Sequence, residues 1–63
     1  MDIHNYISAR IFEPVSISVY PTIIRVYWLS GHKTRHLSRA YTADKLEQIC
    51  DTLADDVNRA MGY

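Results

Sequence analysis

The stretch from Thr42 to Tyr63 most constrains what this 63-residue chain can fold into. Thr42 is a suitable helix N-cap, Asp44 falls in the first turn, where the helix dipole favours an anion, and Gly62 stands where a C-cap needs left-handed backbone. The sequence therefore predicts one long amphipathic helix whose apolar side must pack against another layer. The apolar residues recur three and four positions apart, as along one side of a helix: Leu46, Ile49, Cys50, Leu53, Val57, Ala60 and Met61.

Alternating side chains predict strands before this helix. In residues 15–20, Val15, Ile17 and Val19 alternate with polar residues and Tyr20. In residues 23–30, Ile24, Val26 and Trp28 alternate with Arg25, Tyr27 and Leu29, and Pro21-Thr22 joins the two segments as a turn. Residues 30–33 have the composition of a hairpin turn, after which residues 34–41 are expected to return as an edge strand that carries basic side chains.

Residues 3–12 fit two patterns. As a strand, the segment places Ile7, Ala9 and Ile11 on one face; as a helix, it has Asp2 as an N-cap and isoleucines at positions 3, 7 and 11, and it ends before Pro14. We favour the strand, because its alternation lets it join the strands that follow. A helix here could instead cover the second face of the sheet.

These segments predict a single domain, residues 1–63, of the α+β class. The expected architecture is an antiparallel β-meander of three to four strands with one C-terminal amphipathic helix packed on one face. One helix covers only one face of a sheet, so the opposite face should be exposed. The positions expected to face the helix are Ile7, Ala9, Ile11, Val15, Ile17, Val19, Ile24, Val26 and Trp28.

The exposed sheet face is the leading candidate for a functional surface. A chain of this length buries only about 60% of its unfolded surface, so a partner or a second copy would stabilise it. The sequence favours a protein-interaction module that binds itself as a homodimer, another protein, or both. The homodimer could form face to face or by edge pairing into a continuous sheet. Small free-standing domains of this kind are frequent among phage, prophage and plasmid accessory proteins that bind host proteins. The candidate residues, with an aromatic content typical of interfaces, are Tyr6, Arg10, Phe12, Tyr20, Arg25, Tyr27 and Leu29.

The second hypothesis is nucleic-acid binding by the basic hairpin of residues 31–39. Residues 1–40 carry five basic against two acidic side chains, and residues 41–63 carry two against five, which gives formal charges of +3 and −3. The cationic cluster, beside Tyr27 and Trp28, would contact phosphates. Its members are Arg25, His32, Lys33, Arg35, His36 and Arg39.

The order of elements adds a resemblance to this second hypothesis. Over residues 15–61, three strands followed by a helix are similar to the arm-site-binding domains that precede phage integrases, in which such a sheet reads DNA. If residues 3–12 are helical, the order is also similar to the double-stranded RNA-binding domain. The last helix of that family begins with a lysine cluster that faces phosphate, whereas this one begins Thr42-Ala43-Asp44-Lys45-Leu46. This departure, the acidic helix and the net charge of zero make nucleic-acid binding the second choice.

Nothing in the sequence predicts catalysis or a bound cofactor. The nitrogen and sulfur ligands are His4, His32, His36 and Cys50, and Cys50 lies on the apolar side of the helix, so we expect no metal site. Glycine occurs only at positions 31 and 62, which excludes a glycine-rich phosphate loop. A single cysteine and the absence of a long apolar run or a signal segment favour a cytoplasmic protein without a membrane or small-molecule partner.

Overall fold

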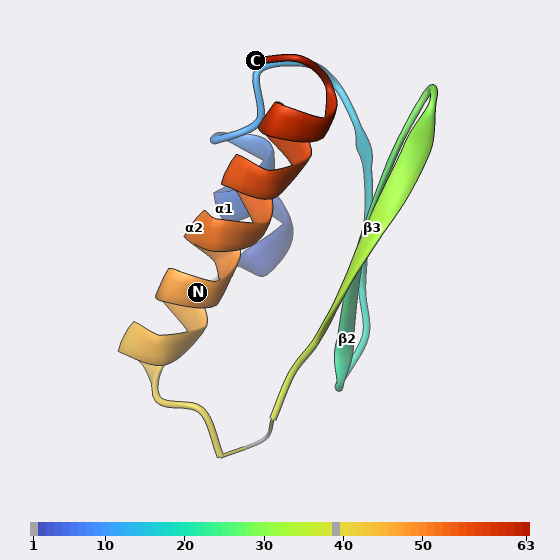
Figure 1. Cartoon of the computed structure of the whole chain (residues 1–63). Coiled ribbons are helices and arrows are strands. Elements are labelled where there is room, and N and C mark those ends of the chain that lie inside the picture. Colours follow the sequence, from blue (N-terminus) through green and yellow to red (C-terminus); the bar gives the residue numbers. More distant parts are fainter. Residues whose placement is uncertain (1, 39) are drawn as a thin grey trace.

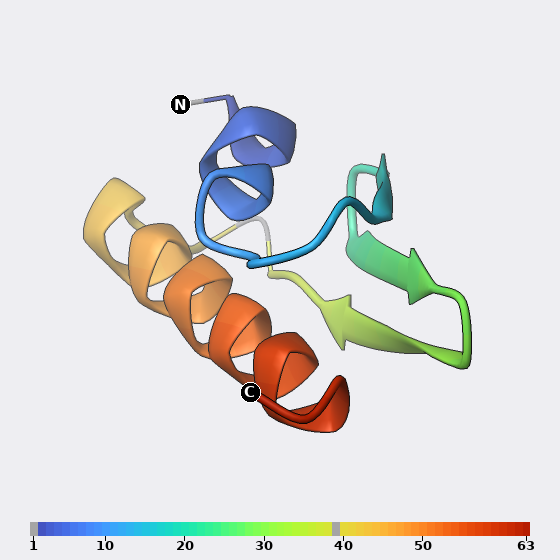
Figure 2. The same cartoon turned by 90° about the horizontal axis from the view of Figure 1, so that it is seen from above.

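The computed structural model describes residues 2–38 and 40–63. The elements follow the order α1 (Ile3–Ser8), β1 (Ser16–Val19), β2 (Ile23–Trp28), β3 (Gly31–His36) and α2 (Ala43–Ala60) (Figure 1). The three strands form one antiparallel sheet in the order β1-β2-β3. Both helices lie on the same side of this sheet, which gives a two-layer α+β fold (Figure 2). The predicted meander with a C-terminal helix is therefore confirmed.

Helix α2 begins and ends where the sequence predicts. The Thr42 hydroxyl accepts a hydrogen bond from the Lys45 N–H (3.2 Å). At the other end Gly62 has a φ of 99°, and its N–H donates to the Arg59 carbonyl (3.0 Å) while the Tyr63 N–H donates to the Asn58 carbonyl (2.9 Å). These two bonds make a Schellman C-cap, which needs the positive φ that glycine adopts without strain.

The core lies between α2, α1 and the inner face of the sheet. On β2, Ile24 and Val26 are completely buried, whereas Arg25 and Tyr27 between them are exposed, so the predicted alternation is confirmed. The residues that α2 buries lie slightly to one side of the predicted stripe, because Ala54 and Asn58 are buried whereas Ala60 is exposed. The buried apolar cluster consists of Ile7, Ile11, Ile24, Val26, Cys50, Leu53, Ala54 and Val57.

The preference for a strand at residues 3–12 is wrong. Ile3–Ser8 forms helix α1, capped by the Asp2 carboxylate, which accepts a hydrogen bond from the Asn5 N–H (3.2 Å). Ile7 and Ile11 are buried on either reading, but Ala9, which the strand would have buried, is exposed. Ile7 and Ile11 fit both the alternation of a strand and the spacing of a helix, so the pattern alone did not distinguish a strand from a helix. Helix α1 packs against β1 and α2 on the inner side of the sheet and leaves the outer face bare.

The hairpin also differs from the prediction. Leu29 and Ser30 form a two-residue turn, Trp28 pairs with Gly31, and β3 has ended at His36 instead of continuing to residue 41. A Cβ atom on Gly31 would lie 3.3 Å from the indole of Trp28, so glycine leaves room for that ring beside the backbone. Glycine thus starts the return strand here and is not part of the turn.

Candidate protein-interaction surface

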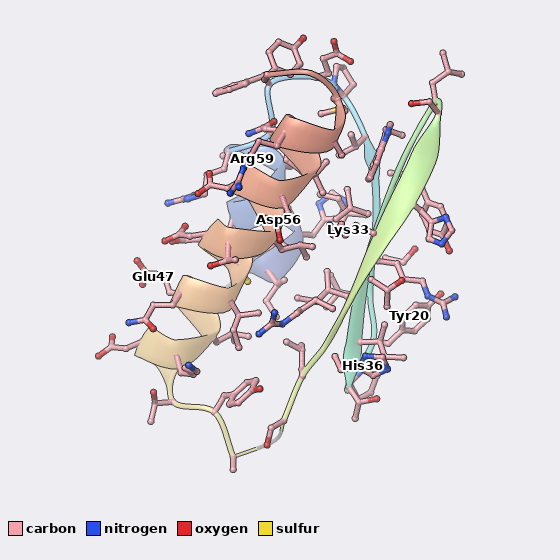
Figure 3. All side chains as sticks on the ribbon, viewed as in Figure 1. Tyr20, Lys33, His36, Glu47, Asp56 and Arg59 are labelled. Atoms are coloured by element: carbon pink, nitrogen blue, oxygen red, sulfur yellow. The ribbon has the colours of Figure 1, made fainter. Side chains whose placement is uncertain are left out.

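The predicted partner-binding residues do not form one surface. The register places Arg25 and Tyr27 on the outer face, opposite Ser18 and Ser16, and Tyr20 lies on the same side just after β1 (Figure 3). Leu29 stands at the tip of the hairpin and is fully exposed. Tyr6, Arg10 and Phe12 lie on α1 and the connection after it, so their placement on the sheet face is wrong, because this segment is not a strand.

Tyr6 and Arg10 join the two helices. The Tyr6 hydroxyl donates to the Asp51 carboxylate (2.8 Å), the Arg10 Nε forms an ion pair with the same oxygen (2.9 Å), and the Arg10 guanidinium lies 3.5 Å from the centroid of the Tyr6 ring. Loss of hydration and the hydrogen bond to Asp51 raise the pKa of Tyr6 to about 12. These contacts give both side chains a structural role between α1 and α2.

Asn58 fixes the connection that follows α1. Its side-chain Oδ1 accepts from the Phe12 N–H (3.0 Å), and its Nδ2 donates to the Arg10 carbonyl (2.9 Å). Asn58 is the one buried polar side chain of the described residues, and both ends of its amide are satisfied. The bend that carries the chain from α1 to β1 therefore depends on a single side chain of α2.

The outer face of the sheet is more polar than predicted. Without residues 6–12 it carries serine, threonine, histidine, one arginine, tyrosine and a single isoleucine, Ile23, and Tyr27 stacks obliquely on His32 (5.7 Å between centroids). Such a composition is compatible with water and gives no apolar patch. The face consists of Ser16, Ser18, Tyr20, Ile23, Arg25, Tyr27, His32, Thr34 and His36.

The predicted basic cluster is divided between the two sides of the sheet. Arg25, His32 and His36 belong to the outer face, whereas Lys33 and Arg35 pair with Val26 and Ile24 and so lie on the side of the helices. Figure 3 shows Lys33 on the side of α2 and His36 on the opposite side. Arg39 lies outside the described residues. Within those residues the ion pairs join Arg10 to Asp51 and Arg59 to Asp56, and none involves β2 or β3.

An apolar hollow lies at the end of the sheet where β1 begins and β2 ends. It is open to solvent and has a volume of about 400 Å³. The hairpin tip, the start of β1 and the C-terminus lie at this same end of the molecule (Figure 1). Exposed Phe12 packs edge-on against Tyr63, with 5.3 Å between ring centroids. The lining residues are Pro14, Val15, Ser16, Tyr27, Trp28 and Leu29.

The two edges of the sheet differ in charge. Edge strand β3 carries Lys33 and Arg35, side chains that discourage pairing with another chain. Edge strand β1 has the sequence Ser-Ile-Ser-Val, and residues 14–24 contain no charged side chain. The edge of β1 is thus open to a further strand, and it leads directly into the apolar hollow through Val15 and Ser16.

The register also shows which backbone groups of β1 are available. The Tyr20 N–H donates to the Ile23 carbonyl (2.8 Å) across the turn, so Tyr20, Ser18 and Ser16 direct their backbone groups toward β2. Because this direction alternates along an antiparallel strand, Ile17 and Val19 direct their N–H and C=O groups away from β2. Edge β1 therefore presents two donors and two acceptors in a row.

Cys50 is completely buried, and loss of hydration raises the pKa of its thiol. No group of three His, Cys, Asp or Glu side chains that could hold a metal ion occurs within residues 2–38 and 40–63. No helix in this described part of the chain is long and apolar enough to span a membrane.

The chain matches no protein-family model, no curated protein and no solved structure. Because residues 3–8 form helix α1, the elements of this chain follow the order α-β-β-β-α. The double-stranded RNA-binding domain has a similar order of elements. The first turn of α2 still carries Asp44 where that family has its lysine cluster.

Proposed function

We propose that this chain is a non-enzymatic protein-interaction module that binds an extended segment of a partner along β1. The observation that carries the proposal is the uncharged edge of β1 beside an apolar hollow. In strand addition, backbone hydrogen bonds provide affinity and side-chain pockets provide specificity, and this end of the sheet offers both. The proposal includes a cytoplasmic setting and the role of an accessory protein, of the phage or prophage kind, that binds a host protein.

The hollow favours a ligand segment with an apolar or proline side chain near one end. Its walls combine the rings of Tyr27 and Trp28 with Pro14, and Leu29 stands at its rim. Flat aromatic and proline surfaces provide contact area with little loss of side-chain entropy. A segment paired with β1 that continues past Ser16 would place its next residues against these walls.

A peptide selection tests the proposal. A display library of random extended peptides is selected on the immobilised wild-type protein, and enriched peptides are compared on variants. We expect peptides with an apolar or proline anchor, and we expect Val19→Pro to reduce their affinity at least tenfold. Proline at position 19 removes an N–H that does not bond to β2, so β1 should remain in place.

Matched variants make this test specific. Val19→Thr keeps the N–H and the β-branched shape, and it should bind the selected peptides like the wild type. Tyr27→Asp places a charge at the hollow and should lower the affinity for peptides that carry the apolar or proline anchor. Failure to enrich any peptide, or enriched peptides that bind Val19→Pro as well as wild type, would contradict strand addition at β1.

Nucleic-acid binding is a second candidate, favoured by one specific observation. Residues 14–43 contain four basic side chains and no acidic one, and all seven acidic residues lie outside this range. A mobility-shift titration with DNA and RNA at low salt tests it. We expect Arg25→Ala and Lys33→Ala to weaken a salt-sensitive shift. No shift with either nucleic acid would remove this candidate.

A further inference from the structure

We infer that the strand added to β1 is β1 of a second copy of this chain, antiparallel to the first, with the two Ser18 residues opposite each other. This inference rests on the proposed strand addition and names its partner. It would join two three-stranded sheets into one sheet of six strands.

The direction of the backbone groups limits how two copies can pair. A two-fold axis perpendicular to the sheet places residues opposite each other whose side chains lie on the same face, and bonds form only between groups that point outward. On β1 the outward groups are those of Ile17 and Val19. Centring the axis on Ser18 brings Ile17 of one copy opposite Val19 of the other, so four N–H···O bonds form.

The neighbouring centres are less favourable. An axis through Ile17 would pair Val19 with Val15 of the second copy. Val15 lies outside β1. An axis through Val19 would place Ile17 opposite Pro21, which has no N–H to donate. The centre on Ser18 uses only residues that are already extended in β1.

The side chains fit this register on both faces. On the helix side, Val19 is 42% exposed although it pairs with fully buried Ile24, and Ile17 is half-buried. Opposite one another across the axis, they would cover each other's exposed area. On the outer side, the Ser18 hydroxyls would meet each other, and Ser16 would face Tyr20 of the second copy, so hydrogen-bonding groups meet at both places.

Charge favours a second copy at β1 and disfavours it at β3. A two-fold axis brings identical segments together, so each charged side chain on the edge would lie near the same charge of the second copy and be repelled by it. Residues 14–24 carry no charge, whereas pairing at β3 would bring Lys33 and Arg35 of both copies together. Each chain has zero formal net charge, so no net repulsion opposes approach of the two copies.

Site-specific crosslinking tests the register. Opposite residues that are not hydrogen-bonded to each other lie about 4.5 Å apart at their Cα atoms, within the range of a disulfide. Ser18→Cys should therefore oxidise to a covalent dimer. Ser16→Cys, on the same face but two residues from the axis, should not, because its two copies would lie more than about 10 Å apart. Peptide mass spectrometry should place the bond between the introduced cysteines, since native Cys50 is buried.

Sedimentation equilibrium provides the second measurement. Wild-type protein at rising concentration should approach twice the 7.3 kDa chain mass, Val19→Thr should do the same, and Val19→Pro should remain at one chain mass. Circular dichroism of Val19→Pro should show the wild-type spectrum. A wild-type monomer at about 1 mM, where weak pairs with Kd near 1 mM are half formed, would overturn the inference.

Other outcomes are equally decisive. A dimer that persists in Val19→Pro, or one that crosslinks equally well at positions 16 and 18, would overturn the register and the strand contact. If wild type is a monomer but selected peptides still require Val19, strand addition survives and the second copy is excluded. If neither peptides nor a second copy bind, the proposed function fails as well.

Discussion

Two polar side chains of α2, Asn58 and Asp51, bind the N-terminal segment. Asn58 bonds to the backbone of residues 10 and 12, and Asp51 accepts from Tyr6 and Arg10. No sequence pattern pointed to Asn58, because an asparagine near the end of a predicted helix is typical of an exposed residue. Its role depends on which backbone groups the tertiary fold leaves without a partner.

Replacing Asn58 should therefore be costly. Asn58→Ala removes a buried side chain and leaves the part-buried Phe12 N–H and Arg10 carbonyl without this partner, and we expect a loss of about 1–3 kcal/mol in the free energy of unfolding. Arg59→Ala, at an exposed position next to it, should change that free energy by less than about 0.5 kcal/mol. Urea unfolding followed by circular dichroism measures both. Equal stabilities for the two variants would contradict the role assigned to Asn58.

The raised pKa of Tyr6 predicts a change in stability at alkaline pH. The pKa is 10.0 in the unfolded chain and about 12 in the folded one, so the folded state holds the proton more tightly. The stabilisation is fully present below pH 10 and is lost as pH rises from 10 to 12. Tyr6→Phe removes this titration, so its stability should fall less than that of wild type over the same interval.

Thermal melts at pH 8, 10 and 11.5 measure this difference, with Tyr27→Phe as a control at a tyrosine whose hydroxyl makes no bond to Asp51. The control should follow wild type. A Tyr6→Phe protein that loses stability in parallel with wild type up to pH 11.5 would show that the hydroxyl contributes nothing through its proton.

Among the helices and strands, the sequence predicted correctly those whose own residues carry a cap or a clear periodicity. For helix α2 the sequence shows the N-cap, charged residues that complement the helix dipole, and apolar residues along one side. For β2 it shows strict alternation. Helix α1 was misassigned because Ile7 and Ile11 satisfy both periods, and the choice depends on packing: α1 covers the side of the sheet near β1, while α2 contacts β3. The sequence analysis allowed pairing at a strand edge, but it did not identify β1 as the uncharged edge, because alternation identifies faces, whereas edges require strand order.

Two substitutions distinguish the helix from the strand at residues 3–12. Ile7→Ala should cost about 2–5 kcal/mol, since Ile7 is completely buried in the core. Ala9→Lys should change stability by less than about 0.5 kcal/mol, because Ala9 is exposed in the structure, although a strand would have buried it. Chemical denaturation compares them. Similar large losses for both variants would favour a strand and contradict α1.

At the scale of the whole molecule, charge and hydrogen-bonding capacity are unevenly distributed. The sheet carries Arg25, Lys33 and Arg35 but no acidic side chain, and β1 lies at its one uncharged edge. The sequence predicted an exposed surface opposite α2, and the outer face is indeed bare, but its apolar members lie elsewhere. The fold instead gathers apolar residues at the end of the sheet, beside the open edge.

Strand addition at β1 requires that the outward N–H groups of Ile17 and Val19 acquire partners. Amide hydrogen exchange, measured residue by residue by NMR at low and high protein concentration, tests this directly, with Ser18 and Tyr20 as internal references whose N–H groups point toward β2. We predict that Ile17 and Val19 exchange fast in dilute protein and slow at least tenfold in concentrated protein, while the references change little. Fast exchange at both residues at every concentration, and with selected peptides present, would contradict strand addition at β1.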